Sequence, residues 1–174
     1  MYGYQKHKVF ISFYHHDDQQ YKNYIDHNLS GNIINKSVMQ GEYDPDDSDE
    51  YIKRLIREDK ISDSSVIVVL VGNNTKNRKH VDWEIYAGLR ASINGSAGLI
   101  GIFLPTVKKA DNGGYYYDDM PARLADNIKS GYATFCDWNY ALNNFDMLIE
   151  EAFQSRITKK HLIDNSRPQM KYNR

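Results

Sequence analysis

The sequence predicts an α/β fold, a parallel sheet with helices on both of its faces. Three apolar runs rich in β-branched residues, at 8–13, 64–71 and 99–104, are typical of strands that are covered on both sides. Helical patterns lie between them, and the one at 78–89 repeats its apolar residues at i, i+4, i+7 and i+8. Because strands and helices alternate along the chain, parallel pairing with helical crossovers is expected.

The first half of the chain adds weaker elements. A helical pattern at 21–29 follows the first strand, and Gly31 stands where a C-capping glycine is expected. A short strand is predicted at 36–39. An acidic loop at 41–50 follows, and its Ser48 is expected to cap a short amphipathic helix.

The second half ends in a further helix, strand and helix. Pro121 suits the first turn of a helix at 122–128, a strand is predicted at 132–136, and a last amphipathic helix at 142–153. Neither an internal repeat nor an interdomain linker interrupts the pattern. The sequence therefore predicts five strands in one sheet.

Composition restricts the function. The 174 residues carry a formal net charge of −1, which gives no electrostatic basis for wrapping nucleic acid or a membrane surface. We expect a single domain at 1–160 and a basic tail at 161–174 that is loose from Arg167 onward. Cys136 is the one cysteine, so no intrachain disulfide forms. The N-terminus lacks the apolar run of a signal peptide, and a cytoplasmic protein is expected.

Glu84 stands out in the helical pattern at 78–89 because it falls on a face of small and apolar residues. Two interpretations remain open. A glutamate in the first turn is stabilised by the helix dipole by about 0.3–1 kcal/mol. Alternatively, a carboxylate at the rim of an apolar pocket stabilises a developing cation or binds a sugar hydroxyl.

The expected topology places Glu84 near a crevice. In open parallel sheets, ligands bind beyond the carboxyl ends of the strands, where the strand order reverses. If the first strand is central, residues 12–18 and 72–74 flank that crevice, and the helix with Glu84 starts from the second of these segments.

Two other motifs have simpler explanations. His15, His16, Asp17 and Asp18 resemble metal ligands, but adjacent residues cannot all converge on one ion, so a helix start is favoured and no metal site is predicted. The glycines at 95–101 precede a strand instead of following one, which indicates a turn and not a dinucleotide-binding loop.

The opening motif KVFISFYHHD (residues 8–17) resembles that of TIR (Toll/interleukin-1 receptor) domains. The run at 66–72, HVDWEI (80–85) and PARLADNI (121–128) follow in the order and spacing of the bacterial TIR-like branch. Within that branch the chain is similar to the TIR-domain sensors of the Thoeris anti-phage defence system. The resemblance spans about residues 8–155.

The resemblance implies a flavodoxin-like sheet of strand order 2-1-3-4-5. Catalytic TIR domains cleave the nicotinamide–ribose bond of NAD⁺ with a glutamate on the helix after the third strand, and that position falls on Glu84. It further implies a hydrolase or ADP-ribosyl cyclase that makes a cyclic ADP-ribose signal, dependent on a trigger. This diffusible signal reaches an effector protein of the ThsA type. NAD⁺ is then the substrate, and no cofactor is required.

Residues at the tip of the first strand are the expected nucleotide contacts. Phe13 or Tyr14 would stack on a base or on nicotinamide, and His15 would meet a phosphate or ribose, with Ser12 beside them. Trp83 is also expected to contact the nucleotide. Many TIR enzymes place a tryptophan four residues before the glutamate, but in this sequence His80 stands at that position.

Loops at 41–50 and 108–119 are candidate lids that would exclude water from a cyclase. Two rival functions remain open. One is a non-catalytic TIR module that acts by self-association, and the other is a nucleotide sensor without turnover. Cys136 falls in a predicted strand and is expected in the core.

Overall fold

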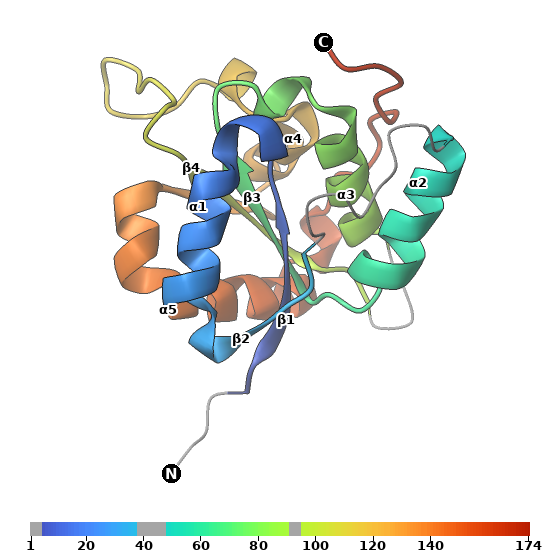
Figure 1. The fold of residues 1–174 in the computed structure, drawn as a ribbon, viewed down its shortest axis with the longest axis horizontal. Coiled ribbons are helices and arrows are strands. Elements are labelled where there is room, and N and C mark those ends of the chain that lie inside the picture. Colours follow the sequence, from blue (N-terminus) through green and yellow to red (C-terminus); the bar gives the residue numbers. More distant parts are fainter. Residues whose placement is uncertain (1–4, 38–47, 91–94) are drawn as a thin grey trace.

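The computed structural model describes residues 5–37, 48–90 and 95–174 as one α/β unit (Figure 1). The strands are β1 (His7–Ser12), β2 (Ile33–Asn35), β3 (Val66–Val71), β4 (Gly98–Phe103) and β5 (Thr134–Asp137). The helices are α1 (His15–Asn28), α2 (Asp49–Leu55), α3 (Lys79–Leu89), α4 (Ala122–Lys129) and α5 (Trp138–Thr158). Short 3₁₀ turns lie at Ser30–Asn32, Thr75–Asn77, Tyr117–Asp119 and Lys160–Leu162, and a π-helical segment at Ile56–Ile61.

All strand pairs are parallel, in the order β2-β1-β3-β4-β5. This confirms the predicted fold class, including the order that the resemblance implied. Since β1 and β3 are neighbours, the strand order reverses between them. Ser12 at the end of β1 lies in register with Val69 of β3, which continues for two more residues to Val71 at the same edge of the sheet.

Two hydrophobic clusters cover the two faces of the sheet. On one face, α1 and α5 contribute Ile25, Phe145 and Ile149, which pack over strand residues such as Val68 and Ile100. On the other face, α2, α3 and α4 pack over the alternate strand residues, in the arrangement visible in Figure 1. Successive side chains of a strand point to opposite faces of the sheet, so the central strands are buried on both faces.

The local predictions were largely confirmed. The Ser48 hydroxyl accepts a hydrogen bond from the backbone N–H of Tyr51, 3.3 Å away, and so caps α2. The last helix is longer than predicted because Asp137 caps it, with its carboxylate 2.8 Å from the backbone N–H of Tyr140. The last strand begins two residues later and ends one residue later than the predicted 132–136.

Two predictions in the first half were wrong. The short strand lies at Ile33–Asn35 and not at 36–39, because its pairing with β1 sets His7 opposite Ile33 and buries Ile33. Residues 38 and 39 lie outside the described part. Gly31 is not a left-handed helix cap, because α1 ends at Asn28 with Leu29 as its C-cap, and the chain then enters a 3₁₀ turn that contains Gly31.

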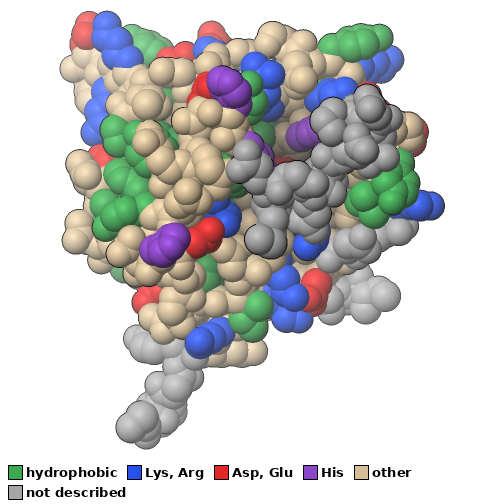
Figure 2. All heavy atoms as spheres, viewed as in Figure 1, with side chains coloured by type: hydrophobic (Ala, Val, Ile, Leu, Met, Phe, Trp, Pro, Cys, Tyr) green, Lys and Arg blue, Asp and Glu red, His purple; other side chains and the backbone are tan. Residues whose placement is uncertain are grey.

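The face of the molecule drawn in Figure 2 is mixed in charge. In Figure 2, basic and acidic side chains are interspersed over the face shown, without a large area of one sign. Within the described residues, no helix has the length and apolar character needed to span a membrane.

Candidate functional site

The centre of the site is a hydrogen bond between Ser12 and Glu84. Ser12 ends β1 and Glu84 lies in the second turn of α3, and the Ser12 hydroxyl donates to the Glu84 carboxylate. Ser12 is 1% exposed and Glu84 is 5% exposed. The carboxylate therefore points into the molecule at the edge of the sheet where β1 and β3 end, and not to bulk solvent.

Burial changes the protonation of Glu84. Loss of hydration raises its pKa to about 8, and the hydrogen bond from Ser12, which favours the charged form, lowers it in part. At neutral pH the carboxyl group is mostly protonated when no ligand is bound. A cation placed beside the carboxyl group would lower its pKa and favour the ionised form. A carboxyl group with such a raised pKa, placed where parallel strands end, is typical of functional sites.

The N-termini of α1 and α3 meet at this edge. Neither N-cap residue, Tyr14 or Arg78, caps its own helix with a side chain. The guanidinium of Arg78 lies over the Tyr14 ring, 4.2 Å from its centroid. The Nε of Arg78 is buried and finds no hydrogen-bond partner among the described residues. Helix N-termini and an incompletely paired guanidinium together suit an anion such as a diphosphate.

Two histidines lie on α1 and α3 within range of each other's charge. Burial lowers the pKa of His15, and the Lys22 charge lowers it further. Burial also lowers the pKa of His80, and the charges of Lys79 and His15 lower it further. Both rings are therefore mostly neutral at pH 7, so each can donate one hydrogen bond and accept another.

The predicted contacts divide into two groups. Ser12, Phe13, Tyr14 and His15 stay together at the tip of β1, and of these Ser12 contacts Glu84. Phe13 is 4% exposed, and its ring stacks on that of His15 at 4.1 Å between centroids. Tyr14 and His15 are half-exposed. Tyr14 is therefore more exposed than Phe13, and its ring lies between the Arg78 guanidinium and the His16 ring, whose centroid is 5.8 Å away.

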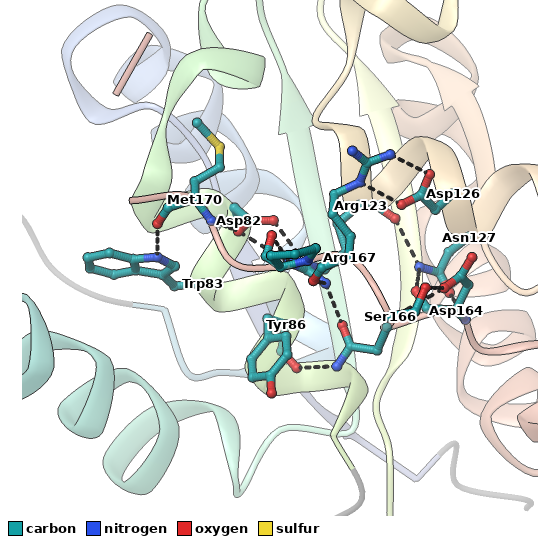
Figure 3. Close-up of polar contacts among 12 residues, drawn as sticks. Asp82, Trp83, Tyr86, Arg123, Asp126, Asn127, Asp164, Ser166, Arg167 and Met170 are labelled. Carbon is teal, nitrogen blue, oxygen red and sulfur yellow. Dashed lines mark hydrogen bonds and ion pairs between the residues drawn. The ribbon is translucent and has the colours of Figure 1, made fainter. Parts of the chain in front are cut away.

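Trp83 is not brought to the Ser12–Glu84 pair. Its indole N–H donates to the backbone carbonyl of Met170, 2.8 Å away, in the C-terminal segment (Figure 3). The ring is 1% exposed and lies near Lys53, whose Nζ is 4.6 Å from the ring centroid. Its orientation follows from helix geometry, because adjacent residues point about 100° apart.

The acidic pair at the start of α1 is structural. Asp18 is 2% exposed, and burial together with the Asp17 charge raises its pKa to about 6. Its carboxylate lies against Gly72 and within 3.4 Å of the Thr75 hydroxyl, which joins α1 to the segment after β3. Among the described residues, no group of three or more His, Cys, Asp or Glu side chains is arranged to hold a metal ion.

The two candidate lids differ in what the structure describes. Residues 41–47 lie outside the described part of the chain. The loop at 108–119 is packed on the fold: Tyr115 stacks on Phe103 at 3.8 Å between ring centroids, and Asp119 forms an ion pair of 3.0 Å with Lys76. Lys76 belongs to the 3₁₀ turn between β3 and α3, so this loop contacts the segment from which α3 starts.

A cavity of about 650 Å³ lies at the other end of β1. Its lining includes His7, Ile33, Phe145 and Glu150. His7 and Ser12 are at opposite ends of the strand, which corresponds to about 16 Å at 3.3 Å per residue. This cavity is therefore separate from the Ser12–Glu84 pair.

Sequence reasoning missed two polar side chains of the site. Arg78 precedes α3 and gave no periodic signal, although its position beside the predicted crevice segment 72–74 was a usable indication. His80 was noted only as standing in place of a tryptophan. Its proximity to His15 depends on the parallel pairing of β1 with β3, which the local sequence does not contain.

The fold and the site define a TIR-like domain: a 2-1-3-4-5 parallel sheet with a glutamate on the helix after β3. The family model "Thoeris protein ThsB, TIR-like domain" matches residues 10–109, which is more than half of the 174 residues. The chain belongs to this ThsB family.

One solved structure is similar at the level of the whole chain. It is described as the activated Roq1 resistosome directly recognizing the pathogen effector XopQ, in its TIR domains. The identity is 13%, the TM-score is 0.41, and the match covers 91% of this chain and 84% of that chain. The comparison with curated proteins gave no match. Family membership therefore rests on the family model.

Proposed function

We propose that this chain cleaves the nicotinamide–ribose bond of NAD⁺ and closes the remaining ADP-ribose into a cyclic signal in anti-phage defence. The observation that carries the proposal is the buried carboxyl group of Glu84, hydrogen-bonded to Ser12 at the edge where the strand order reverses. Membership of the ThsB family supports the same assignment.

The chemistry requires a negative charge where a positive charge develops. When the bond between the nicotinamide nitrogen and the ribose C1′ breaks, its electron pair leaves with nicotinamide, and an oxocarbenium-like ribose remains. An ionised Glu84 beside the ribose would stabilise that cation. The positive nicotinamide ring of bound NAD⁺ would itself lower the pKa of Glu84 and so ionise it on arrival.

Cyclisation follows if a nucleophile of the same molecule reaches C1′ before water does. The internal nucleophile forms the new bond to C1′ and loses its proton, whereas attack by water would give ADP-ribose. We assign base or nicotinamide stacking to Tyr14, with Phe13 behind it, and ribose or phosphate contacts to His15. Arg78 is assigned to the diphosphate on the basis of its buried, unsatisfied Nε.

The product connects the site to a partner. A diffusible cyclic nucleotide would act on an effector of the ThsA type, in the cytoplasm, without direct contact between the two proteins. Self-association of the chain is compatible with this scheme and would serve as a trigger. Contacts with nucleic acid or a membrane are not part of it.

The test is nicotinamide release from NAD⁺ by wild type and by Glu84→Gln, with the small-molecule products identified by mass spectrometry. We expect a cyclic product from wild type and at least a hundredfold loss in the variant. Equal turnover by both proteins would remove Glu84 from the reaction. Binding of NAD⁺ by calorimetry without any product would favour a sensor, and neither binding nor product in triggered cells would favour a non-catalytic interaction module.

A further inference from the structure

The C-terminal segment, residues 163–174, is fastened to α3 along much of that helix, and we name it the C-terminal strap. The expectation of a loose tail was wrong. The backbone N–H of Met170 donates to Asp82 at 2.8 Å, and the Met170 carbonyl accepts from the Trp83 indole at 2.8 Å (Figure 3). Further along, the Asn165 side chain donates to the Tyr86 carbonyl at 3.1 Å.

The strap also caps the start of α3. The N-cap residue Arg78 gives no side-chain cap, but the Asn173 side-chain oxygen accepts from the Lys79 backbone N–H at 2.9 Å. The Arg174 N–H then donates to the Asn77 carbonyl at 3.0 Å. A residue 94 positions away thus supplies the bond that an N-cap side chain usually supplies.

A buried arginine holds the strap in place. Arg123 on α4 is 0% exposed and pairs with Asp82 at 2.9 Å. Its terminal nitrogens also donate to the Asn165 side chain at 3.0 Å and to the backbone carbonyls of Arg167 at 2.8 Å and Pro168 at 3.2 Å. Lifting the strap would leave a buried guanidinium with unmade hydrogen bonds, which is costly. The strap is therefore an integral part of the fold.

The strap fixes the rotation of α3 about its axis. Asp82, Trp83 and Glu84 are consecutive, so their side chains leave the helix about 100° apart. The strap binds the first two, and the third points to Ser12. Hydrogen bonds in two of these directions restrain the rotation of α3 about its axis, in addition to the core packing of Val81, Ile85 and Leu89. They therefore bear on the position of the Glu84 carboxylate against Ser12.

We propose that the C-terminal strap is a positioning element of the site, which places Glu84 against Ser12 by holding Asp82, Trp83 and the N-terminus of α3. Its effect on turnover rests on the proposed NAD⁺ cleavage, whereas its effect on the position of Glu84 does not. None of the strap residues is a catalytic residue.

The experiment uses the full chain with Trp83→Phe and Asn173→Ala, singly and together. Trp83→Phe keeps an aromatic ring but removes the indole donor, and Asn173→Ala removes only the cap. Two controls match them: Asn173→Asp retains a cap acceptor, and Tyr172→Ser changes a strap side chain that is 79% exposed. Cooperative unfolding of each variant establishes that it folds. Asn173 is exposed, so its single variant retains the fold even if the double variant does not.

Two measurements report on position without any turnover. NMR titration of ¹³C-labelled Glu84 should move its midpoint downward by at least one pH unit in the double variant, because water reaches the carboxylate. Amide exchange in the first turns of α3 should become at least tenfold faster. Both controls should match wild type.

Kinetics completes the test. We expect kcat for NAD⁺ to fall at least tenfold with KM changed less than threefold, because Glu84 is misplaced while the nucleotide contacts remain. Unchanged titration and exchange in the double variant would overturn the strap proposal, and so would a loss of turnover with both unchanged. If titration and exchange change while even wild type gives no turnover, the positioning role stands and the proposed reaction fails.

Discussion

Ser12, the last residue of β1, donates a hydrogen bond to the carboxylate of Glu84 on α3, and both side chains are buried. The two residues lie 72 positions apart and meet because β1 pairs in parallel with β3, from whose end α3 departs. Burial raises the pKa of Glu84 and the Ser12 hydroxyl lowers it, so the charge of the site depends on the balance of these two effects.

Removal of the Ser12 hydroxyl should shift the pH dependence of turnover. Cleavage needs ionised Glu84, so kcat/KM for NAD⁺ should rise with pH to a plateau above about 8 in wild type. Ser12→Ala removes a bond to the charged form, worth about 1.5–3 kcal/mol, and should move this rise to higher pH and lower kcat/KM at pH 7 about tenfold or more. A profile identical to wild type would show that Ser12 does not tune Glu84.

Glu84 should destabilise the fold as the pH rises. Its pKa in the folded protein, about 8, lies above its ordinary value of 4.5, so its favourable contribution is complete below pH 4.5 and is lost as pH rises through 8. The Glu84→Gln variant has no ionisable group at this position, so it does not show this pH-dependent loss of stability. Between pH 5 and pH 9 the free energy of unfolding of wild type should fall relative to the variant by about 4 kcal/mol. Urea unfolding of both proteins at these pH values measures it, and parallel pH curves would contradict a buried, proton-bearing Glu84.

Arg78 should act on substrate binding. Arg78→Gln removes the positive charge over Tyr14, and we expect KM for NAD⁺ to rise about tenfold, since a hydrogen bond to a charged group contributes about 1.5–3 kcal/mol. Because the diphosphate is remote from the breaking bond, kcat should change less. Arg90→Gln, at the exposed far end of α3, serves as the charge-matched control. An unchanged KM in Arg78→Gln would exclude the diphosphate assignment.

A side chain at Gly72 should reduce stability while Asp18 is present. A Cβ at this position would lie 2.3 Å from a carboxylate oxygen of Asp18. Gly72→Ala should therefore reduce stability by about 1–3 kcal/mol, and less in an Asp18→Ala background, where the obstructing group is gone. Gly31→Ala is the control, because a Cβ there meets nothing within 4 Å. If Gly72→Ala reduced the free energy of unfolding equally in both backgrounds, Asp18 would not be the obstructing group.

Cys136 should not take part in the reaction. Burial in β5 and the neighbouring Asp137 raise the pKa of its thiol to about 12, so about one molecule in ten thousand carries the thiolate at pH 8. Iodoacetamide should label the native protein far more slowly than the protein in urea, and Cys136→Ser should retain wild-type turnover. Rapid labelling of the native protein, with loss of activity, would contradict this.

Several features could be read from the sequence because they depend on near neighbours. The apolar composition of the runs at 64–71 and 99–104 was enough to predict β3 and β4. The capping preference of serine at Ser48 predicted the start of α2. Helical periodicity was enough to place Glu84 on an inward face. The short β2 was missed because three residues are too few for a period, and its position is decided by pairing with β1.

The sequence by itself determined the class of fold and the order of its elements, and it singled out Glu84 as a candidate site residue. Only the tertiary structure decided that Ser12 is the partner of Glu84, that Trp83 turns away to Met170, and that the C-terminal strap is bound to α3 through Arg123. The physical reason is the range of the interactions. Propensity, periodicity and capping act within a few residues, whereas these hydrogen bonds join polar groups from distant segments and leave no repeating pattern in the sequence.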